Sequence, residues 1–407
     1  MKIDFLNIAE NKGISLRIIH KGQPGFAYTS ELTQDAIDEV VESAFSMAQI
    51  TTKDPYLCLS HFKGDYPEVS IYDENINGLS IEQKIEFALE MERAARSYAS
   101  CVKKVRHSQY EDVNAQIFIT NSNGLNFSYT RTLFGGSILA VAEEKNEAEM
   151  GWYYAFHPFF HALKPTDIGE EAAKLAVQAL GGKPISTQKT PVIFKNQVMS
   201  EVLHILSPSF LADEVQKGKS LLANLLGEKA MSPLVNIYDD GLFPNGYGTR
   251  PCDDEGVPQR KNVLVKDGNI VGFLYDTYTA KKEDKYSTGN AGRNGIETPP
   301  KVAITNFYLE PLKKNFDDLL KELHKGLVVT DMLGLHTADP VSGDFSVGAS
   351  GYWVERGERV FAVKGIAIAG NILNLFKNVI SIGNDLIFFG HCGAPSVLID
   401  GVQIGGV

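Results

Sequence analysis

The spacing of apolar residues changes at about Val105, and this change limits the folds that are open to the chain. Before it, apolar residues recur at helical spacing in two stretches, 32–48 and 80–98, and the second begins with a Ser-x-x-Gln capping box. After it, apolar and polar residues alternate, and a turn ending in Asn-Gly predicts a hairpin over 116–130. Helical and strand patterns in separate runs are typical of an α+β fold.

A second change divides the chain near its middle. The sequence predicts a helix over 167–180 and a linker over 181–191, which is rich in Gly, Pro, Ser and Thr. After the linker, strand patterns outnumber helical ones; the expected strands are 263–274 (a hairpin), 347–354, 360–368, 382–389 and 396–399. We therefore predict a smaller N-terminal α/β part and a large, strand-rich, mostly antiparallel C-terminal domain. The expected boundaries are 1–104 for an N-terminal α+β subdomain, 105–185 for a central hairpin/helix subdomain, and 186–407 for the C-terminal domain.

Charge and composition exclude several classes of function. The 407 residues carry a formal net charge of −11 and show no basic patch, so we expect no nucleic-acid partner. No apolar run is long enough to span a membrane, and the N-terminus has no signal-peptide core. The chain has 4 cysteines and no Cys-x-x-Cys, which favours a reducing, cytoplasmic setting over a disulfide framework.

Two histidine-containing motifs carry weak chemical signals. His157 and His161 have a spacing that suits zinc on a helix, but Pro158 favours a turn, and a structural role is the preferred interpretation. Cys392 follows His391 directly, and a base beside a thiol could generate a nucleophile. Neighbouring side chains in a strand point to opposite faces, so a buried, inert thiol is favoured.

The segment Ser342–Tyr352 alternates glycines and small residues with larger ones. Glycine in a strand allows another backbone to come close. One interpretation is an exposed edge or groove that accepts an extended peptide by strand addition. The other is a bent strand within the core, and glycine placement alone does not decide between them.

Several motifs, in the same order, resemble those of the TldD/PmbA (TldE) family. In the C-terminal half they are Ser342–Tyr352, Val363–Asn371, Ile382–Leu386 and Pro395–Gly406, and upstream they are Tyr238–Gly241 and Gly272–Ala280. The resemblance implies a cytoplasmic protease system that trims peptides and unfolded proteins, with an active TldD–TldE heterodimer. It also implies an α+β N-terminal part and a strand-rich C-terminal part. Older names connect the family with modulation of DNA gyrase.

In this family the TldD-type subunit holds zinc with a His-Glu-x-x-x-His helix and a distant cysteine. By the resemblance, Leu203 and Pro208 stand where the two histidines would be, His204 where the glutamate would be, and Cys392 where the cysteine belongs. Leucine and proline side chains offer no metal ligand, and one thiol cannot hold a catalytic zinc. The expectation is a chain with no catalytic residues, no metal and no cofactor, and zinc only in a TldD-type partner.

Whether the chain is itself an enzyme stays open, because the family is one of hydrolases. The favoured hypothesis is a PmbA/TldE-type subunit that lacks the zinc motif, forms a dimer with a TldD-type subunit or with itself, and helps to hold a peptide or unfolded protein. The residues expected to contact the peptide are Arg293, Gly343, Asp344, Gly348 and Ser350. The alternatives are a self-sufficient hydrolase that uses Cys392 and His391, and a non-proteolytic, gyrase-modulator-like regulatory protein.

Overall fold

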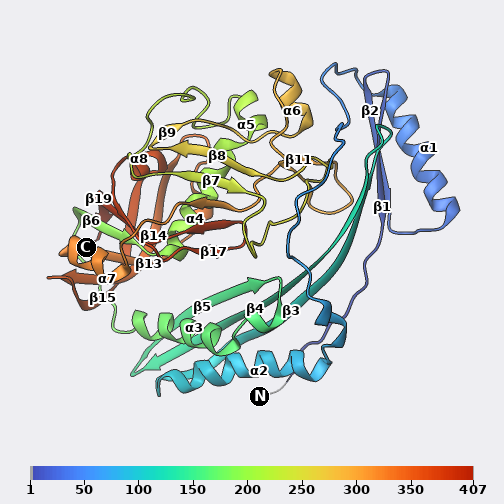
Figure 1. Cartoon of the computed structure of the whole chain (residues 1–407). Helices are drawn as coiled ribbons and strands as arrows, with labels where there is room; N and C mark the ends of the chain where they lie inside the picture. The colour runs from blue at the N-terminus through green and yellow to red at the C-terminus, as the bar shows by residue number, and fades with distance from the viewer. Residues whose placement is uncertain (1–2, 407) are drawn as a thin grey trace.

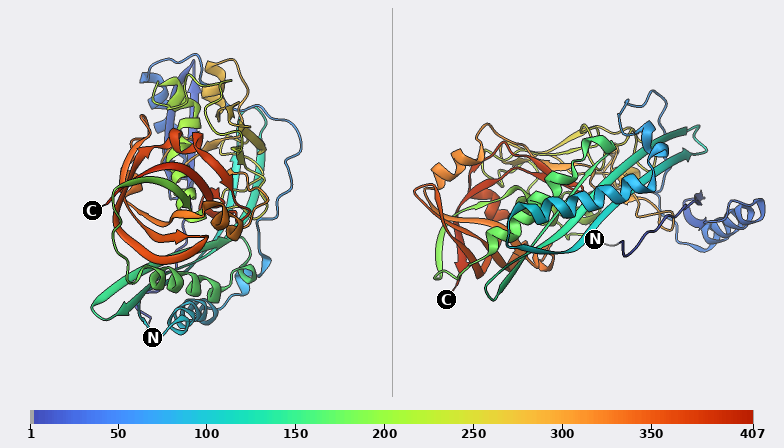
Figure 2. Two further views of the ribbon diagram at one scale, coloured as in Figure 1. Left: turned by 90° about the vertical axis from the view of Figure 1, so that its left-hand side faces the viewer. Right: turned by 90° about the horizontal axis from the view of Figure 1, so that it is seen from below.

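The computed structural model describes residues 3–406 and has three parts (Figure 1). The first is a hairpin of β1 (Ile14–His20) and β2 (Gln23–Thr29) covered by helix α1 (Gln34–Ile50). Helix α1 buries Val40, Ala44 and Ala48, which lie on one face. The view from below shows this small part projecting from the body of the molecule (Figure 2).

The central part is an antiparallel sheet with helices on one face. Its strands are β3 (Val102–Thr120), β4 (Asn126–Glu144) and β5 (Glu147–His157), and the helices are α2 (Ile81–Tyr98) and α3 (Pro165–Ala179). Short 3₁₀ turns lie at η1 (Glu74–Gly78) and η2 (Phe160–Ala162). The helices bury an apolar face against the sheet and lie below it in the view of Figure 1.

One sheet of the C-terminal part closes on itself. Its order is β15-β14-β13-β6-β19-β16, and an additional β15–β19 pairing joins the first strand to the fifth. Only β6 and β13 pair in parallel. Figure 2 shows the resulting barrel-like ring in its left view. The strands are β6 (Gln188–Phe194), β13 (Lys325–Leu333), β14 (Asp344–Glu355), β15 (Glu358–Asn371), β16 (Val379–Ile382) and β19 (Val397–Gly405).

The second C-terminal sheet has the order β17-β18-β12-β7-β8-β9. Its strands are β7 (Ile237–Asp240), β8 (Lys261–Lys266), β9 (Asn269–Ile270), β12 (Phe307–Leu309), β17 (Ile387–Phe389) and β18 (Cys392–Ala394). Helix α4 (Asn196–Leu206) contacts β12, β17 and β18 of this sheet and β13 of the other. The helix is therefore a central core element of the domain.

Shorter elements complete the C-terminal part. They are η3 (Ser207–Phe210), α5 (Ala212–Gln216), α6 (Thr277–Lys282), β10 (Ala291–Gly292), β11 (Lys301–Val302), α7 (Phe316–Leu323), η4 (Leu335–Thr337) and α8 (Ile372–Lys377). No helix within residues 3–406 is long and apolar enough to cross a bilayer.

The structure confirms the α+β class, the capping box at Ser80 and the hairpin that ends in Asn123-Gly124. The prediction of one strand over 382–389 is wrong, because β16 ends at Ile382 and β17 begins at Ile387. Between them, Asp385 accepts hydrogen bonds from the backbone and hydroxyl groups of Ser396, which holds this segment out of a strand. The linker expected over 181–191 is also shorter than predicted, since β6 starts at Gln188.

Strand β14 contains the glycine-rich segment, and it does not form an exposed edge over most of its length. From Gly348 to Glu355 it pairs with β13 on one side and β15 on the other. A Cβ atom on Gly351 would lie 1.8 Å from the carbonyl oxygen of Val328, so only glycine fits this close approach. The register shifts between Ala349 and Gly351, which agrees with the bent core strand rather than with an open edge.

Candidate functional site

Helix α4 carries two of the four positions that the sequence resemblance assigns to a zinc motif, Leu203 and His204. Its apolar face packs into the main core, and Leu203 is fully buried there. Pro208 follows in η3, where the α-helix has already ended at Leu206. Both side chains are hydrocarbons, and Leu203 points into the core rather than toward a ligand.

His204 and Cys392 lie close together. The Sγ atom of Cys392 in β18 is 3.8 Å from Nδ1 of His204, which lies on the exposed side of α4. Cys392 is buried, and this burial, with a smaller contribution from the charge of Asp239, raises the pKa of its thiol. The group is therefore a neutral thiol at neutral pH, which is a poor nucleophile and a poor metal ligand.

The residues present do not fit a zinc ion. A catalytic zinc needs about three protein ligands, and the thiol and imidazole here supply at most two. Within residues 3–406 no three or more His, Cys, Asp or Glu side chains are grouped to hold a metal ion. Glu201, one turn before His204, has its pKa raised to about 7 by burial and by Asp331, so it is only partly ionised at neutral pH.

His391 directly precedes Cys392 in the sequence, but its imidazole contacts other residues rather than the Cys392 thiol. Its Nδ1 is 2.7 Å from the carbonyl oxygen of Thr305, and its ring meets Tyr247 edge-on at 4.8 Å. The ring keeps surface open to solvent, yet surrounding protein lowers its pKa by desolvation. The imidazole beside Cys392 is that of His204, so the structure does not bring Cys392 and His391 together as a catalytic pair.

The His157–His161 pair adopts the structural role that Pro158 suggested. Strand β5 ends at His157, and the Nδ1 of that residue accepts a hydrogen bond of 3.0 Å from the backbone of Phe159. His161 follows in η2, outside any helical turn that would align the two rings.

A cavity of about 360 Å³ opens on the other side of His391. Gly248 lies in its wall, where a Cβ atom would sit 2.3 Å from the carbonyl oxygen of Thr305. The charged side chains that line the cavity are Arg131, Arg250, Arg293, Lys301 and Asp254. It is thus a polar, predominantly cationic cavity in a chain with a net charge of −11.

The three arginines reach the cavity from distant parts of the sequence. Arg131 lies on β4, Arg250 lies between β7 and β8, and Arg293 follows β10. Sequence analysis singled out only Arg293 and missed the other two. The one sequence signal for Arg250 is that it sits, like Arg293, in a glycine-containing loop. This feature is too common to identify a site residue.

The remaining expected contact residues lie elsewhere. Asp344 is exposed at the start of β14, where its Oδ1 accepts a hydrogen bond of 2.9 Å from Asn371. Gly343 has φ +77° and lies against Leu221, and Gly348 and Ser350 lie within the paired part of β14. None of these four residues lines the cavity that contains Arg293.

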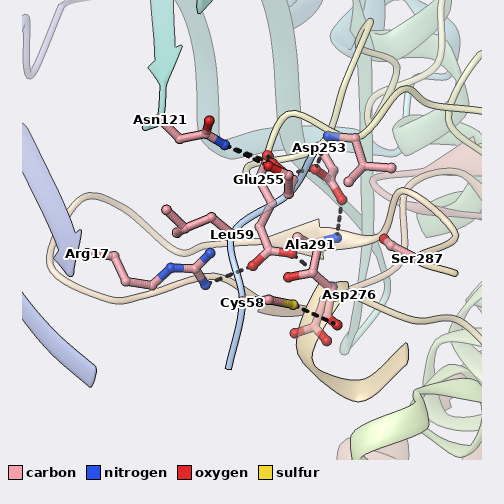
Figure 3. A network of polar contacts seen from close by, with 12 residues as sticks. Arg17, Cys58, Leu59, Asn121, Asp253, Glu255, Asp276, Ser287 and Ala291 are labelled. Atoms are coloured by element: carbon pink, nitrogen blue, oxygen red, sulfur yellow. Dashed lines mark hydrogen bonds and ion pairs between the residues drawn. The ribbon is translucent and has the colours of Figure 1, made fainter. Parts of the chain in front are cut away.

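A buried acidic network lies near the cavity and connects the three parts of the chain (Figure 3). Glu255 makes a close charge contact of 2.7 Å with Arg17 of β1, and its backbone carbonyl accepts a hydrogen bond from Ser60. Asn121, at the tip of the β3–β4 hairpin, donates to the same serine. Next to Glu255, burial raises the pKa of Asp253 to about 7. These contacts hold β1 and the hairpin tip beside the cavity.

The three parts in this order define a class of metallopeptidase-related proteins, and a family model matches each part. They are the PmbA/TldA metallopeptidase domain 1 (residues 1–48), the central domain (74–180) and the C-terminal domain (187–406). The chain belongs to the PmbA/TldD family.

Individual relatives span nearly the whole chain. "Metalloprotease PmbA" of Escherichia coli O157:H7 is 26% identical over 409 residues, covering 100% of this chain and 88% of that protein. "Metalloprotease TldD homolog" of Haemophilus influenzae is also 26% identical, covering 97% and 87%. The sequence is thus related to both named branches of the family.

Two solved structures share the fold. A protein of Thermotoga maritima, named as a candidate modulator of a DNA gyrase, has a TM-score of 0.89 and 31% identity, covering 97% of this chain and 89% of that one. TldE from Thermococcus kodakarensis has a TM-score of 0.88 and 24% identity, covering 96% and 89%. The second likeness supports the fold alone.

Proposed function

We propose that this chain is a non-catalytic, metal-free subunit of a TldD/TldE-type peptidase system in the cytoplasm. It forms a dimer, with a TldD-type subunit or with itself, and helps to hold extended peptides for proteolysis. One observation carries this proposal: the buried hydrocarbon side chain of Leu203 and the ring of Pro208 stand at the positions that the sequence resemblance assigns to two histidine ligands.

The chemistry around these positions supports the same proposal. The thiol of Cys392 is buried and protonated, and the pKa of Glu201 is raised to about 7 by burial. A metal centre needs anionic or neutral donors that converge, and a general base must reach a bound water. Holding a peptide needs neither of these.

The peptide is expected to contact Arg293 in the cavity and the β14 residues proposed from the sequence: Gly343, Asp344, Gly348 and Ser350. For Arg293, the supporting observation is its place in the cavity wall. For Asp344, the supporting observation is that its side chain is exposed at the start of β14. The pairing of β14 with β13 ends at Gly348, so this end of β14 has no neighbour on the β13 side.

Zinc analysis and peptidase assays test the proposal. The purified chain is expected to contain far less than one zinc per chain and to leave unfolded casein and short peptides intact. Mixed with a TldD-type partner, it is expected to form a complex with peptidase activity. Stoichiometric zinc and activity in the isolated chain would contradict the proposal.

A second candidate function has some support from the comparisons. The Thermotoga maritima relative, 31% identical, is named for modulation of a DNA gyrase, and a regulatory protein without proteolytic activity could share this fold. The net charge of −11 makes direct contact with DNA unfavourable, so such a protein would act on another protein. Recovery of a TldD-like chain as the main partner in a pull-down would count against this function.

A further inference from the structure

The cavity beside His391 gathers positive charge that this acidic chain does not balance locally. Three guanidinium groups and one ammonium group line it, with one carboxylate, Asp254. Like charges in a partly desolvated space repel each other, and excess charge there is costly without a counter-ion. The arrangement therefore calls for an anion.

Asp254 is already engaged by Arg250. Its Oδ2 lies 3.1 Å from Nη1 of Arg250 and also accepts a hydrogen bond of 2.9 Å from the backbone nitrogen of Arg293. Burial by itself would lower the pKa of Arg250, but the charges of Asp254 and Asp253, the hydrogen bond to Asp254 and the effect of Tyr129 together outweigh burial and raise this pKa. The charge of Asp254 also acts on Arg131 and Arg293, but only beyond ion-pair distance, and burial outweighs it, so the pKa of each of these two guanidinium groups is lowered.

Arg131 and Arg293 contact neutral groups instead. Arg131 donates a hydrogen bond of 2.9 Å to the carbonyl oxygen of Tyr247, and Arg293 donates one of 2.6 Å to the hydroxyl of Ser15. Among residues 3–406 neither side chain is within ion-pair distance of a carboxylate. Each guanidinium has five N–H donors in a planar fork, so most of its donors stay available to a ligand.

His391 adds a recognition element of a different kind. With Nδ1–H donating to the carbonyl of Thr305, the remaining ring nitrogen has a lone pair that can accept an N–H. A ligand that carries both a carboxylate and an N–H satisfies the arginines and the imidazole together. Inorganic phosphate offers an O–H in place of the N–H, so it is the competing anion with which a carboxylate must be compared.

We infer that this cavity binds a carboxylate group of a peptide, with Arg131 and Arg293 as the forked donors. The inference rests on the proposed function for the identity of the ligand as a peptide, and it adds the chemical group that the chain recognises. A volume of about 360 Å³ lies within the usual range for small-molecule sites of about 300–1,000 Å³. The carboxylate is either the C-terminal group or an acidic side chain, and the two are separable by experiment.

Isothermal titration of the purified full chain, without partner or added metal, tests the inference. The probes are acetyl-tetra-alanine with a free C-terminus, the same peptide as its amide, acetyl-Ala-Ala-Asp-Ala-amide, and inorganic phosphate. We expect the free acid to bind at least about ten-fold more tightly than the alanine amide, because a charge-assisted forked pair is lost. Tighter binding of the Asp-containing amide than of the free acid would identify the source as a side chain, weaker binding would identify it as the C-terminus, and equal binding would show that the cavity accepts either carboxylate.

Matched variants connect the binding to the cavity. R131Q and R293Q are each expected to weaken binding of the free acid about ten-fold or more. R93Q makes the same charge change in an exposed ion pair on α2 and should leave binding unchanged. Because Arg131 is half-buried, circular-dichroism melts check that R131Q folds, and R293K, which keeps the charge but not the fork, gives an independent test.

Several results would overturn the inference. They are equal affinity for the free acid and both amides, tighter binding of phosphate than of the free acid, or unchanged binding in R293Q and R293K. These results are independent of the zinc and peptidase assays. If the chain shows no preference for the carboxylate but forms an active heterodimer, only this inference is rejected. If the isolated chain contains zinc and is active, only the proposed function is rejected.

Discussion

The apolar core around α4 and the arginine-lined cavity are neighbouring regions, joined through Cys392 and His391, and they differ in packing and charge. On the α4 side, Leu203 is buried in a continuous apolar core and the Cys392 thiol is protonated. On the other side, the cavity keeps arginines partly desolvated around open volume. The α4 side is filled by packed apolar side chains, while the cavity side keeps charged side chains partly buried at an energetic cost.

This difference indicates where function resides in the chain. A core that fills the positions of a metal motif gains stability from each buried methylene group. Clustered cationic side chains reduce stability, and proteins keep such groups where a ligand uses them. The cavity is therefore a better candidate for binding than the α4 positions are for catalysis.

The largest expected effect is on the packed side. L203A removes a fully buried side chain, so it should lower the free energy of unfolding by about 2–5 kcal/mol through lost burial and a residual cavity. Urea denaturation followed by fluorescence measures this change. H204A, on the exposed side of the same helix, is the control and should cost under about 0.5 kcal/mol. Equal losses in the two variants would contradict the assignment of Leu203 to the core.

A pH-dependent effect of intermediate size is expected at Glu201. Burial raises its pKa from the ordinary glutamate value of 4.5 to about 7 in the folded chain, so between these pH values the folded state binds more protons than the unfolded state. Stability due to this group therefore falls as pH rises from about 4.5 to 7. E201Q removes the titration, and its stability relative to wild type should increase over this range by on the order of 1 kcal/mol after allowance for solvent screening.

Urea denaturation of both proteins at pH 5 and pH 7.5 makes this measurement. E90Q, at a helical glutamate of the central part, serves as a control whose difference from wild type should not change in this way. A wild-type protein that gains stability relative to E201Q with rising pH would show that the sign is wrong.

Local patterns in the sequence predicted much of the fold. The capping box at Ser80 and the hairpin turn at Asn123-Gly124 depend on residues within a few positions of each other, and both were confirmed. The closure of the first C-terminal sheet by the β15–β19 pairing was beyond the sequence, because no local pattern encodes which distant strands pair. The 382–389 segment failed for the same reason: Asp385 bonds with Ser396, on a different segment.

The cavity was even less predictable. Arg131, Arg250 and Arg293 are far apart in sequence, and an isolated arginine is most often a surface residue. Only the fold places them around one volume. The four positions of the family motif could be assigned from resemblance, but the 3.8 Å contact between Cys392 and His204 required the packing of β18 on α4.

The cavity side gives a ligand-dependent prediction of a size similar to the effect at Glu201. Acetate, a simple carboxylate, should stabilise the chain relative to chloride at equal ionic strength, by about 1.4 kcal/mol when its concentration is roughly ten times its Kd. The increase should be lost in R293Q and retained in R93Q, since Arg293 lines the cavity and Arg93 lies in an exposed ion pair on α2. Thermal melts at matched ionic strength measure it, and an equal increase in R293Q would assign the effect to general salt action rather than to the cavity.

The smallest expected effect belongs to Cys392. A neutral, buried thiol takes no part in acid–base or nucleophilic chemistry, because the thiolate is the reactive form and burial raises the pKa of this group. C392A should therefore change the peptidase rate of the complex with a TldD-type partner by less than about two-fold, within the range of a small core change. Initial rates on one peptide, with H391A as a comparison on the cavity side, make the measurement. A loss of more than about a hundred-fold in C392A alone, with an intact complex, would reinstate the thiol as a catalytic group and reverse the roles assigned to the two regions.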